Sequence, residues 1–226
     1  MPRHVDHEQR RHRLAEAVWR LAARGGLEDV TLRHVAAEAG VPARQLQYYF
    51  GTREHVLLGA LEILNADAER RAAQRMSDLG PDPSPRAAVR AILLELLPLD
   101  DERRRTQVVH AAYFMRFLTD RALAQSVRDS PHTLEDLVAS LLRQGQELGH
   151  VTPDMDPQAE AAFLVAGAQG LQPPVLLGQY TPQYAVNLID LQVDRLFAGH
   201  HQNASPTGRS HPADSLSITD DRTSGS

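Results

Sequence analysis

The sequence contains no cysteine and no lysine, and only 5% of its residues are aromatic. Without cysteine the chain has no disulfide, no thiolate metal ligand and no cysteine nucleophile. All 24 basic residues other than histidine are therefore arginine. Because lysine is missing even where side chains should face solvent, we attribute this bias to GC-rich coding rather than to a need for bidentate contacts.

Long apolar runs are also missing. No stretch of about 18 apolar residues occurs, so we expect no membrane-spanning helix. The N-terminal segment MPRHVDHEQRRHR has no apolar core followed by a small-residue cleavage site, which argues against a secretory signal. The 226 residues suffice for one large domain or two small ones with a substantial core. We therefore expect a cytoplasmic protein.

Charge is unevenly distributed along the chain. Residues 1–55 carry nine arginines and seven acidic residues, a net charge of +2, whereas residues 56–226 carry 15 and 22, a net charge of −7. A basic excess at the N-terminal end is compatible with nucleic-acid binding. Ordinary scatter explains an excess of this size equally well, so sequence motifs are needed to decide whether the protein binds nucleic acid.

Apolar residues recur at helical spacing from residue 10 to residue 198, and no alternating strand of five or more residues is evident. The sequence therefore predicts an all-α fold. The expected helices are 8–24, 32–39, 43–50, 53–76, 86–97, 101–118, 120–130, 132–149, 157–171 and 182–198. Residues 200–226 are polar and rich in serine, so we expect a disordered tail.

The second and third predicted helices have the spacing of a helix-turn-helix. Thr31 is a suitable N-cap for the second helix, and Gly40 can adopt the left-handed conformation that ends it. Val41 can fill the space between the two helices. Pro42 suits the first turn of the third helix, because its missing N–H would have had no partner there. With the preceding helix, this unit predicts a three-helix DNA-binding domain over residues 8–55.

The third helix divides into two faces. Leu46 and Phe50 should face the core, whereas the polar side chains point outward, namely Arg44, Gln45, Gln47 and Tyr48. Arginine can pair with guanine and glutamine with adenine, each pair contributing about 1–3 kcal/mol of discrimination. A solvent-facing polar surface would explain any one of these residues without DNA, but it explains the whole arrangement poorly.

The stretch 14–61 resembles the N-terminal DNA-binding domain of TetR-family transcriptional regulators. The shared features are RGGL after the first helix, TLRHVAAEAGV in the second, YYF in the third and TREHVL opening the fourth. The resemblance implies DNA contacts from Thr31, Arg44, Gln45, Tyr48 and Arg53, with Ala43 and Gln47 on the reading face. Three residues depart from the usual pattern: Pro42 replaces a Ser or Thr cap, Gln47 a frequent Tyr, and Arg53 the commoner Lys.

A second, shorter resemblance lies in LLPLDDERRRTQVVHAAYFMRFLTD, which is similar to a segment of BetI-type C-terminal domains. It implies that residues 56–199 form a ligand-binding and dimerisation domain. We do not carry choline over from BetI, because a cage for a quaternary ammonium needs several converging aromatic rings. The candidate ligand residues are His110, Tyr113, Phe114, Phe117, Gln169 and Gln172. Plain core packing would produce the same apolar face on the helix at 101–118.

The last two predicted helices, 157–171 and 182–198, carry small and large apolar residues respectively. Such surfaces suit the four-helix dimer interface typical of the family, and they suit packing within one chain equally.

An enzyme is the rival class of protein. The chain has no Gly-rich phosphate loop, no HExxH and no GxSxG motif, and its paired acids lie at helix starts, where capping explains them. We therefore expect no catalytic residue, metal or cofactor. The prediction is a homodimeric repressor that binds a palindromic operator in double-stranded DNA and is released by a small-molecule effector. The alternative is a helical ligand-binding or scaffold protein without specific DNA binding.

Overall fold

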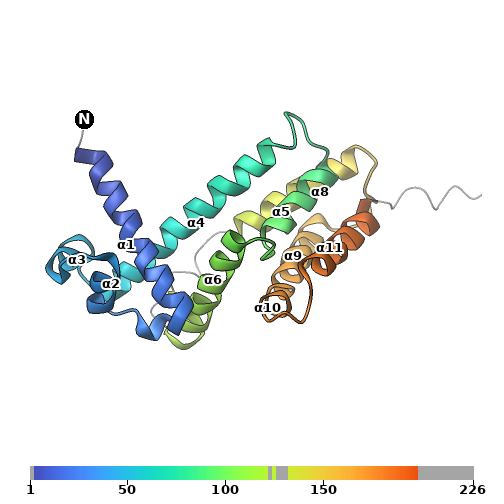
Figure 1. Cartoon of the computed structure of the whole chain (residues 1–226). Helices are drawn as coiled ribbons and strands as arrows, with labels where there is room; N and C mark the ends of the chain where they lie inside the picture. Colours follow the sequence, from blue (N-terminus) through green and yellow to red (C-terminus); the bar gives the residue numbers. More distant parts are fainter. Residues whose placement is uncertain (1–2, 122–123, 126–131, 198–226) are drawn as a thin grey trace, which may run out of the picture.

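The computed structural model describes residues 3–121, 124–125 and 132–197, although not the side chains of residues 3–7 and 48–50. Every regular element within these ranges is a helix, as predicted. Two helical bodies are joined by the long helix α4 (Arg53–Ser77), which runs from one body to the other in Figure 1. The predicted disordered tail lies outside the described residues, as does most of the helix predicted over 120–130.

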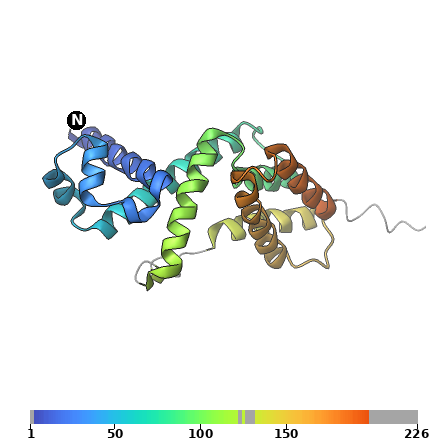
Figure 2. The ribbon, with the colours of Figure 1, turned by 60° about the horizontal axis from the view of Figure 1, so that its bottom comes forward.

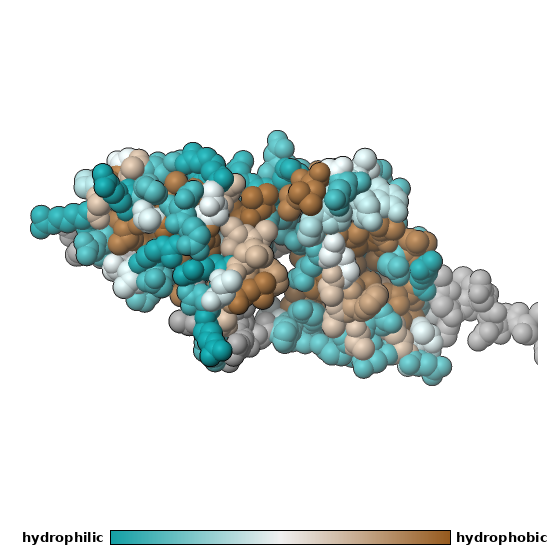
Figure 3. Space-filling model, turned by 90° about the horizontal axis from the view of Figure 1, so that it is seen from below, coloured by the Kyte–Doolittle hydropathy of each residue, from teal (hydrophilic) through white to brown (hydrophobic). Residues whose placement is uncertain are grey.

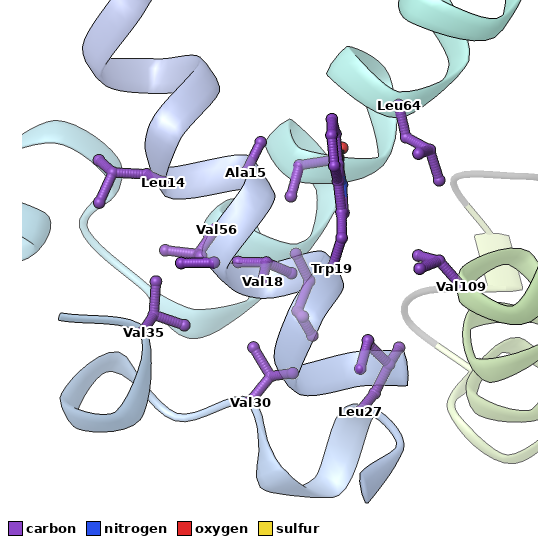
Figure 4. Packing of buried hydrophobic residues seen from close by; sticks show 14 of the residues in the cluster. Leu14, Ala15, Val18, Trp19, Leu27, Val30, Val35, Val56, Leu64 and Val109 are labelled. Carbon is purple, nitrogen blue, oxygen red and sulfur yellow. Dashed lines mark hydrogen bonds between the residues drawn. The ribbon is translucent and has the colours of Figure 1, made fainter. Parts of the chain in front are cut away.

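The N-terminal body contains α1 (Arg3–Gly25), the short 3₁₀ turn η1 (Leu27–Asp29), α2 (Leu32–Ala39), α3 (Ala43–Phe50) and the first half of α4. Its core forms because each helix buries one apolar stripe, and Figure 4 shows several of these side chains converging. Val18, Val35 and Leu46 are fully buried there. The single tryptophan, Trp19, is also buried and donates its indole N–H to the Ala60 carbonyl at 3.0 Å.

Helix α6 (Asp101–Thr119) contributes to this same N-terminal core, although it comes much later in the sequence. Val109 and Tyr113 are buried against α1 and α4, and Tyr113 donates its hydroxyl to the Leu57 carbonyl at 2.8 Å. Burial raises the pKa of the Tyr113 phenol well above its usual value. The first hydrophobic cluster thus continues beyond residue 55, through Leu64 on α4 and onto α6.

The C-terminal body packs α5 (Pro85–Glu95), α8 (Thr133–Glu147), α9 (Pro157–Gly170), α10 (Gln172–Leu176) and α11 (Pro182–Phe197) around a second core. Leu93 and Leu142 are fully buried in it. Arg90 on α5 donates to both carboxylate oxygens of Asp190 on α11, from Nε at 2.5 Å and Nη2 at 3.0 Å. Figure 2 shows α6 standing between the two bodies.

Most helix boundaries agree with the predictions, and two differences have clear causes. Helix α1 begins at Arg3, ahead of residue 8, because its polar first turns carry no apolar signal. The segment QPPVL was expected to be a break, but it forms α10. Pro173 and Pro174 lie in its first turn, where an absent N–H removes no helical hydrogen bond. Among the described helices, none has the length and apolar character needed to cross a bilayer.

Candidate nucleic-acid interface

The turn between α2 and α3 has the backbone geometry that the sequence predicts. Gly40 adopts φ 66° and ψ 33°, a left-handed conformation that a side chain would disfavour. The amide of Gly40 donates to the Ala37 carbonyl at 3.2 Å, and that of Val41 donates to the Ala36 carbonyl at 3.0 Å. These bonds satisfy carbonyls at the C-terminus of α2, so the chain reverses tightly into α3.

The N-termini of the two helices are capped differently. Thr31 is the N-cap of α2, as predicted, and its hydroxyl accepts a hydrogen bond from the His34 amide at 3.1 Å. Pro42 occupies the N-cap position of α3 and offers no side-chain acceptor, so it lies one residue before the first turn in which we placed it. The free amides at the start of α3 therefore depend on solvent or a ligand.

Helix α3 exposes the predicted reading face. Leu46 is fully buried and fixes the helix to the N-terminal core. Ala43, Arg44 and Gln47 are exposed, and Arg44 and Gln47, three residues apart, lie on the same side of the helix. The Tyr48 side chain is outside the described residues, so its predicted DNA contact stays a prediction.

Gln45 has a different environment from its neighbours on α3, because it is only half exposed. It lines an open concavity together with Arg10, Arg13 and Leu14 of α1, with Ala39 at the end of α2 and with Val41 of the turn. Both arginines lie within α1, inside the helix predicted over 8–24. Their position beside α3 was not predicted, because it depends on the packing of α1 against α3 and not on the spacing of residues within α1.

Several arginines of the N-terminal body are available to an anionic partner. Arg13, Arg33 and Arg44 are exposed and have no ion-pair partner within the described part of the chain. Arg20 and Arg24, by contrast, donate from α1 to the Glu38 carboxylate on α2, with Arg20 Nε 2.8 Å from Oε1. These two hydrogen bonds lower the pKa of Glu38, so the clamp between α1 and α2 is charged at neutral pH.

Arg53, the first residue of α4, points toward the protein. Its Nε donates to the Val30 carbonyl at 2.6 Å and its Nη2 donates to the Leu27 carbonyl at 2.5 Å. The side chain is partly buried between α4 and the turn that precedes α2. The sequence placed Arg53 at a DNA phosphate, and nothing in the local sequence signalled these two intramolecular hydrogen bonds.

The six predicted ligand residues lie in different environments. Tyr113 and Phe117 belong to the N-terminal core, with their ring centroids 6.1 Å apart. The remaining four residues lie outside this core. His110 is half-buried, with Nε2 2.9 Å from Asn65 Oδ1, and Gln172 donates to the Leu96 carbonyl at 2.9 Å. Phe114 and Gln169 are exposed on separate helices. The structure therefore does not gather the six side chains around one pocket.

Burial lowers the pKa of His110, so its imidazole is neutral at physiological pH. Arg104, on the same helix, donates to the Leu176 carbonyl at 2.8 Å. Helix α6 thus contacts the C-terminal body near its start and the N-terminal core near its end.

A helix-turn-helix with an exposed second helix, joined through α4 to a larger helical body, is the architecture of a helix-turn-helix transcriptional regulator. Residues 14–60 match the model for bacterial regulatory proteins of the tetR family. Residues 85–198, half of the chain, match the model for the BetI-type transcriptional repressor C-terminal domain. The chain belongs to the TetR family.

Individual relatives agree with this assignment. The chain is 34% identical over 114 residues to the HTH-type transcriptional regulator PksA of Bacillus subtilis (strain 168), which covers 50% of this chain and 54% of that protein. It spans about half the length of the curated relatives it matches. A transcriptional regulator from Rhodococcus sp. Rha1 is 31% identical, with a TM-score of 0.70 over 84% of this chain and 96% of that chain.

A more distant structure, a protein from Saccharomonospora viridis in complex with choline, shares the fold at 24% identity and a TM-score of 0.65 over 85% of this chain and 97% of that chain. The comparisons confirm the predicted family, and they confirm a transcriptional regulator rather than an enzyme.

Proposed function

We propose that this chain is a transcriptional repressor that binds a palindromic operator as a homodimer and releases it when a small-molecule effector binds. The observation that carries the proposal is the exposed face of α3, formed by Ala43, Arg44 and Gln47 above the buried anchor Leu46. A polar helix face held in place by a buried residue on its other side can enter a major groove without rearranging. The protein would act in the cytoplasm, where its DNA is.

The surroundings of α3 suit the phosphate backbone on either side of a groove. Arg13 on α1 lies beside the start of α3, and Arg33 on α2 is exposed and has no ion-pair partner in the described part of the chain. Phosphate contacts of this kind position a protein on the duplex, whereas Arg44, Gln45 and Gln47 would read base edges. Thr31 and Tyr48 are the further predicted phosphate contacts.

The proposed dimer interface lies on α9 and α11. Phe163 on α9 is 71% exposed, and its neighbours on that helix include exposed small residues at Ala166, Gly167 and Gly170. Tyr184 and Leu191 are exposed on α11. Apolar side chains also show over the C-terminal half of the molecule in Figure 3. Pairing these two helices with their copies would cover both surfaces. Binding to a palindromic operator requires the two α3 helices of such a dimer to lie one DNA turn apart, ~34–36 Å.

The proposed effector would act through α6. This helix contacts α10 through Arg104 and the N-terminal core through Tyr113, so a change in its position reaches both bodies. Of the predicted ligand residues on α6, Phe114 is the most accessible, at 60% exposure. A ligand that binds one position of α6 more tightly than the other shifts the protein toward that state, and the change in DNA affinity follows.

The direct test is a gel-shift titration with the intergenic DNA next to the protein's own gene, with random DNA of equal length as competitor. We expect sequence-selective binding that weakens as salt concentration rises. Arg44→Ala should relax the preference at one base pair of the site, while Arg33→Ala should weaken binding to all sequences similarly. Binding that is equally strong to random DNA would favour the alternative, a helical ligand-binding or scaffold protein.

The dimer is tested separately with Phe163→Asp, measured by light scattering after gel filtration. We expect this variant to be monomeric, because a buried unpaired carboxylate on each copy opposes association. Phe114→Asp is the matched control, since it adds the same charge at a similarly exposed phenylalanine outside the proposed interface. If both variants remain dimeric, the interface lies elsewhere.

A further inference from the structure

The feature that prompts a further inference is Arg53, whose guanidinium is occupied by the protein. Its Nε and Nη2 donate to the carbonyls of Val30 and Leu27, two residues of the turn 27–31 that leads into α2. We infer that Arg53 supports DNA binding as a positioning residue, by holding this turn rather than by contacting DNA. This inference rests on the proposed DNA-binding function and identifies how one of its predicted residues acts.

The turn 27–31 determines where α2 begins. Leu27 and Val30 are 3% and 1% exposed, so their side chains anchor the turn in the N-terminal core. The Thr31 amide donates to the Asp29 carbonyl at 3.1 Å, and the Thr31 hydroxyl caps α2. His34 Nδ1 also lies 2.8 Å from the Asp29 carbonyl oxygen. Any displacement of this turn therefore moves Thr31 and the first amides of α2.

The geometry of the contact explains why arginine suits this position. Two carbonyls three residues apart are reached at once by two nitrogens of one planar guanidinium. A lysine ammonium is a single point charge on a flexible stem and cannot reproduce that fork, although it serves well at a DNA phosphate. Substitution by lysine therefore separates the two roles, because it preserves a phosphate contact and breaks the fork.

The same turn is also held from its other side. Arg116 on α6 donates from Nη1 to the Glu28 carboxylate at 3.2 Å, so the turn lies between α4 and α6. Arg116→Ala removes this outer ion pair, with Glu28 largely exposed, and also the ion pair of Arg116 with Asp120 at the end of α6. It leaves both carbonyl contacts of Arg53 in place. Arg116→Ala is therefore a suitable comparison, because it removes an arginine that contacts this turn and keeps the two hydrogen bonds of Arg53 to the turn carbonyls.

The experiment compares Arg53→Ala, Arg53→Lys and Arg116→Ala with the unmodified protein. DNA affinity is measured on the same intergenic fragment across a series of salt concentrations, and amide hydrogen exchange is measured by mass spectrometry over residues 27–34. We expect Arg53→Ala and Arg53→Lys to weaken binding by the same factor, about tenfold, or roughly 1.4 kcal/mol. We expect faster exchange over residues 27–34 in both, an unchanged salt slope, and a smaller change in Arg116→Ala.

Two results would overturn the inference while leaving the proposed function intact. In the first, Arg53 touches DNA directly. This would be shown if Arg53→Lys binds DNA as tightly as the unmodified protein, or if the slope of log affinity against log salt concentration for Arg53→Ala falls by about 0.9 for each phosphate that is no longer bound. In the second, exchange over residues 27–34 is unchanged in Arg53→Ala. If the unmodified protein shows no selective DNA binding, both proposals fail together, and the exchange data then show only whether the turn is anchored.

A double-mutant cycle with Thr31→Val distinguishes positioning from independent stability effects. If Arg53 acts by placing Thr31 and the start of α2, the double variant should bind DNA about as tightly as the weaker single variant. Independent contacts would instead multiply the two reductions in affinity. Multiplicative reductions would therefore contradict the inference even if the exchange of residues 27–34 increased.

Discussion

Replacing Tyr113 with phenylalanine should destabilise the N-terminal body selectively, although residue 113 belongs to the region that the sequence assigned to ligand binding. The substitution removes the hydroxyl that donates to the Leu57 carbonyl and preserves the ring that packs beside Phe117. Leu57 lies inside α4, so its carbonyl still accepts the hydrogen bond of the helix backbone and is not left unpaired. The expected loss is therefore that of one buried hydrogen bond.

We expect this loss to be about 1 kcal/mol in the free energy of unfolding, within the range of roughly 0.5–1.5 kcal/mol for a neutral hydrogen bond. For a chain of this size, that corresponds to a decrease of about 2–4 °C in Tm. Trp19 provides the assay, because it is the only tryptophan and is buried in the same core. Urea unfolding followed by tryptophan fluorescence reports this body, while circular dichroism reports all helices.

Tyr180→Phe is the matched control, since Tyr180 is 38% exposed outside the N-terminal core and its hydroxyl has no hydrogen-bond partner in the described part of the chain. It should leave the fluorescence transition unchanged. If Tyr113→Phe also leaves the fluorescence midpoint unchanged, α6 does not share the core of the DNA-binding helices and our account of the fold is wrong.

The Tyr113 side chain should also make folding stability decrease at alkaline pH. Burial raises the pKa of Tyr113 in the folded state, whereas an unfolded tyrosine ionises near pH 10, as a rough reference. Above that pH the unfolded state has lost its proton and the folded state retains it, so folding stability falls as pH rises. Tyr113→Phe should lose less stability than the unmodified protein above about pH 10. Parallel stability curves would contradict this.

Three further predictions concern other parts of the molecule. His110→Gln should flatten the loss of stability as pH falls below about 6.5, because the folded state keeps the half-buried imidazole of His110 neutral while the unfolded state takes up a proton. Urea titrations at several pH values measure this effect, and identical curves for the two proteins would refute it. Gly40→Ala should cost about 1 kcal/mol at its φ of 66°, with Gly40→Asn less harmful in the same thermal scan. On α5, Leu93→Ala should lower the free energy of unfolding by about 2–5 kcal/mol and Arg90→Ala by less than about 1 kcal/mol. The difference is expected because Leu93 is fully buried, while the Arg90 and Asp190 side chains are about one-third exposed. Equal losses would contradict this ranking.

The sequence was sufficient for the features that depend on local chemistry. Thr31 could be identified as an N-cap because a hydroxyl before an apolar-periodic segment satisfies free helical amides. Gly40 could be placed in the turn because only glycine adopts that backbone conformation without strain. The exposure of Arg44 and Gln47 followed from their helical spacing relative to Leu46. Together these residues determined the helix-turn-helix and the family.

Tertiary structure decided which surfaces meet. Helical periodicity shows that α6 has an apolar face, but it does not show whether that face packs in the first core or the second, so Tyr113 and Phe117 were predicted at a ligand site and lie in the N-terminal core. The direction of Arg53 was equally hidden, because its acceptors are backbone carbonyls, which carry no sequence signal. Periodicity describes which face of a single helix is apolar, whereas the surface against which that face packs depends on a second helix as well. The sequence by itself therefore determined most of the helices and the exposed polar face of α3, and only packing decided which residues remain available to DNA.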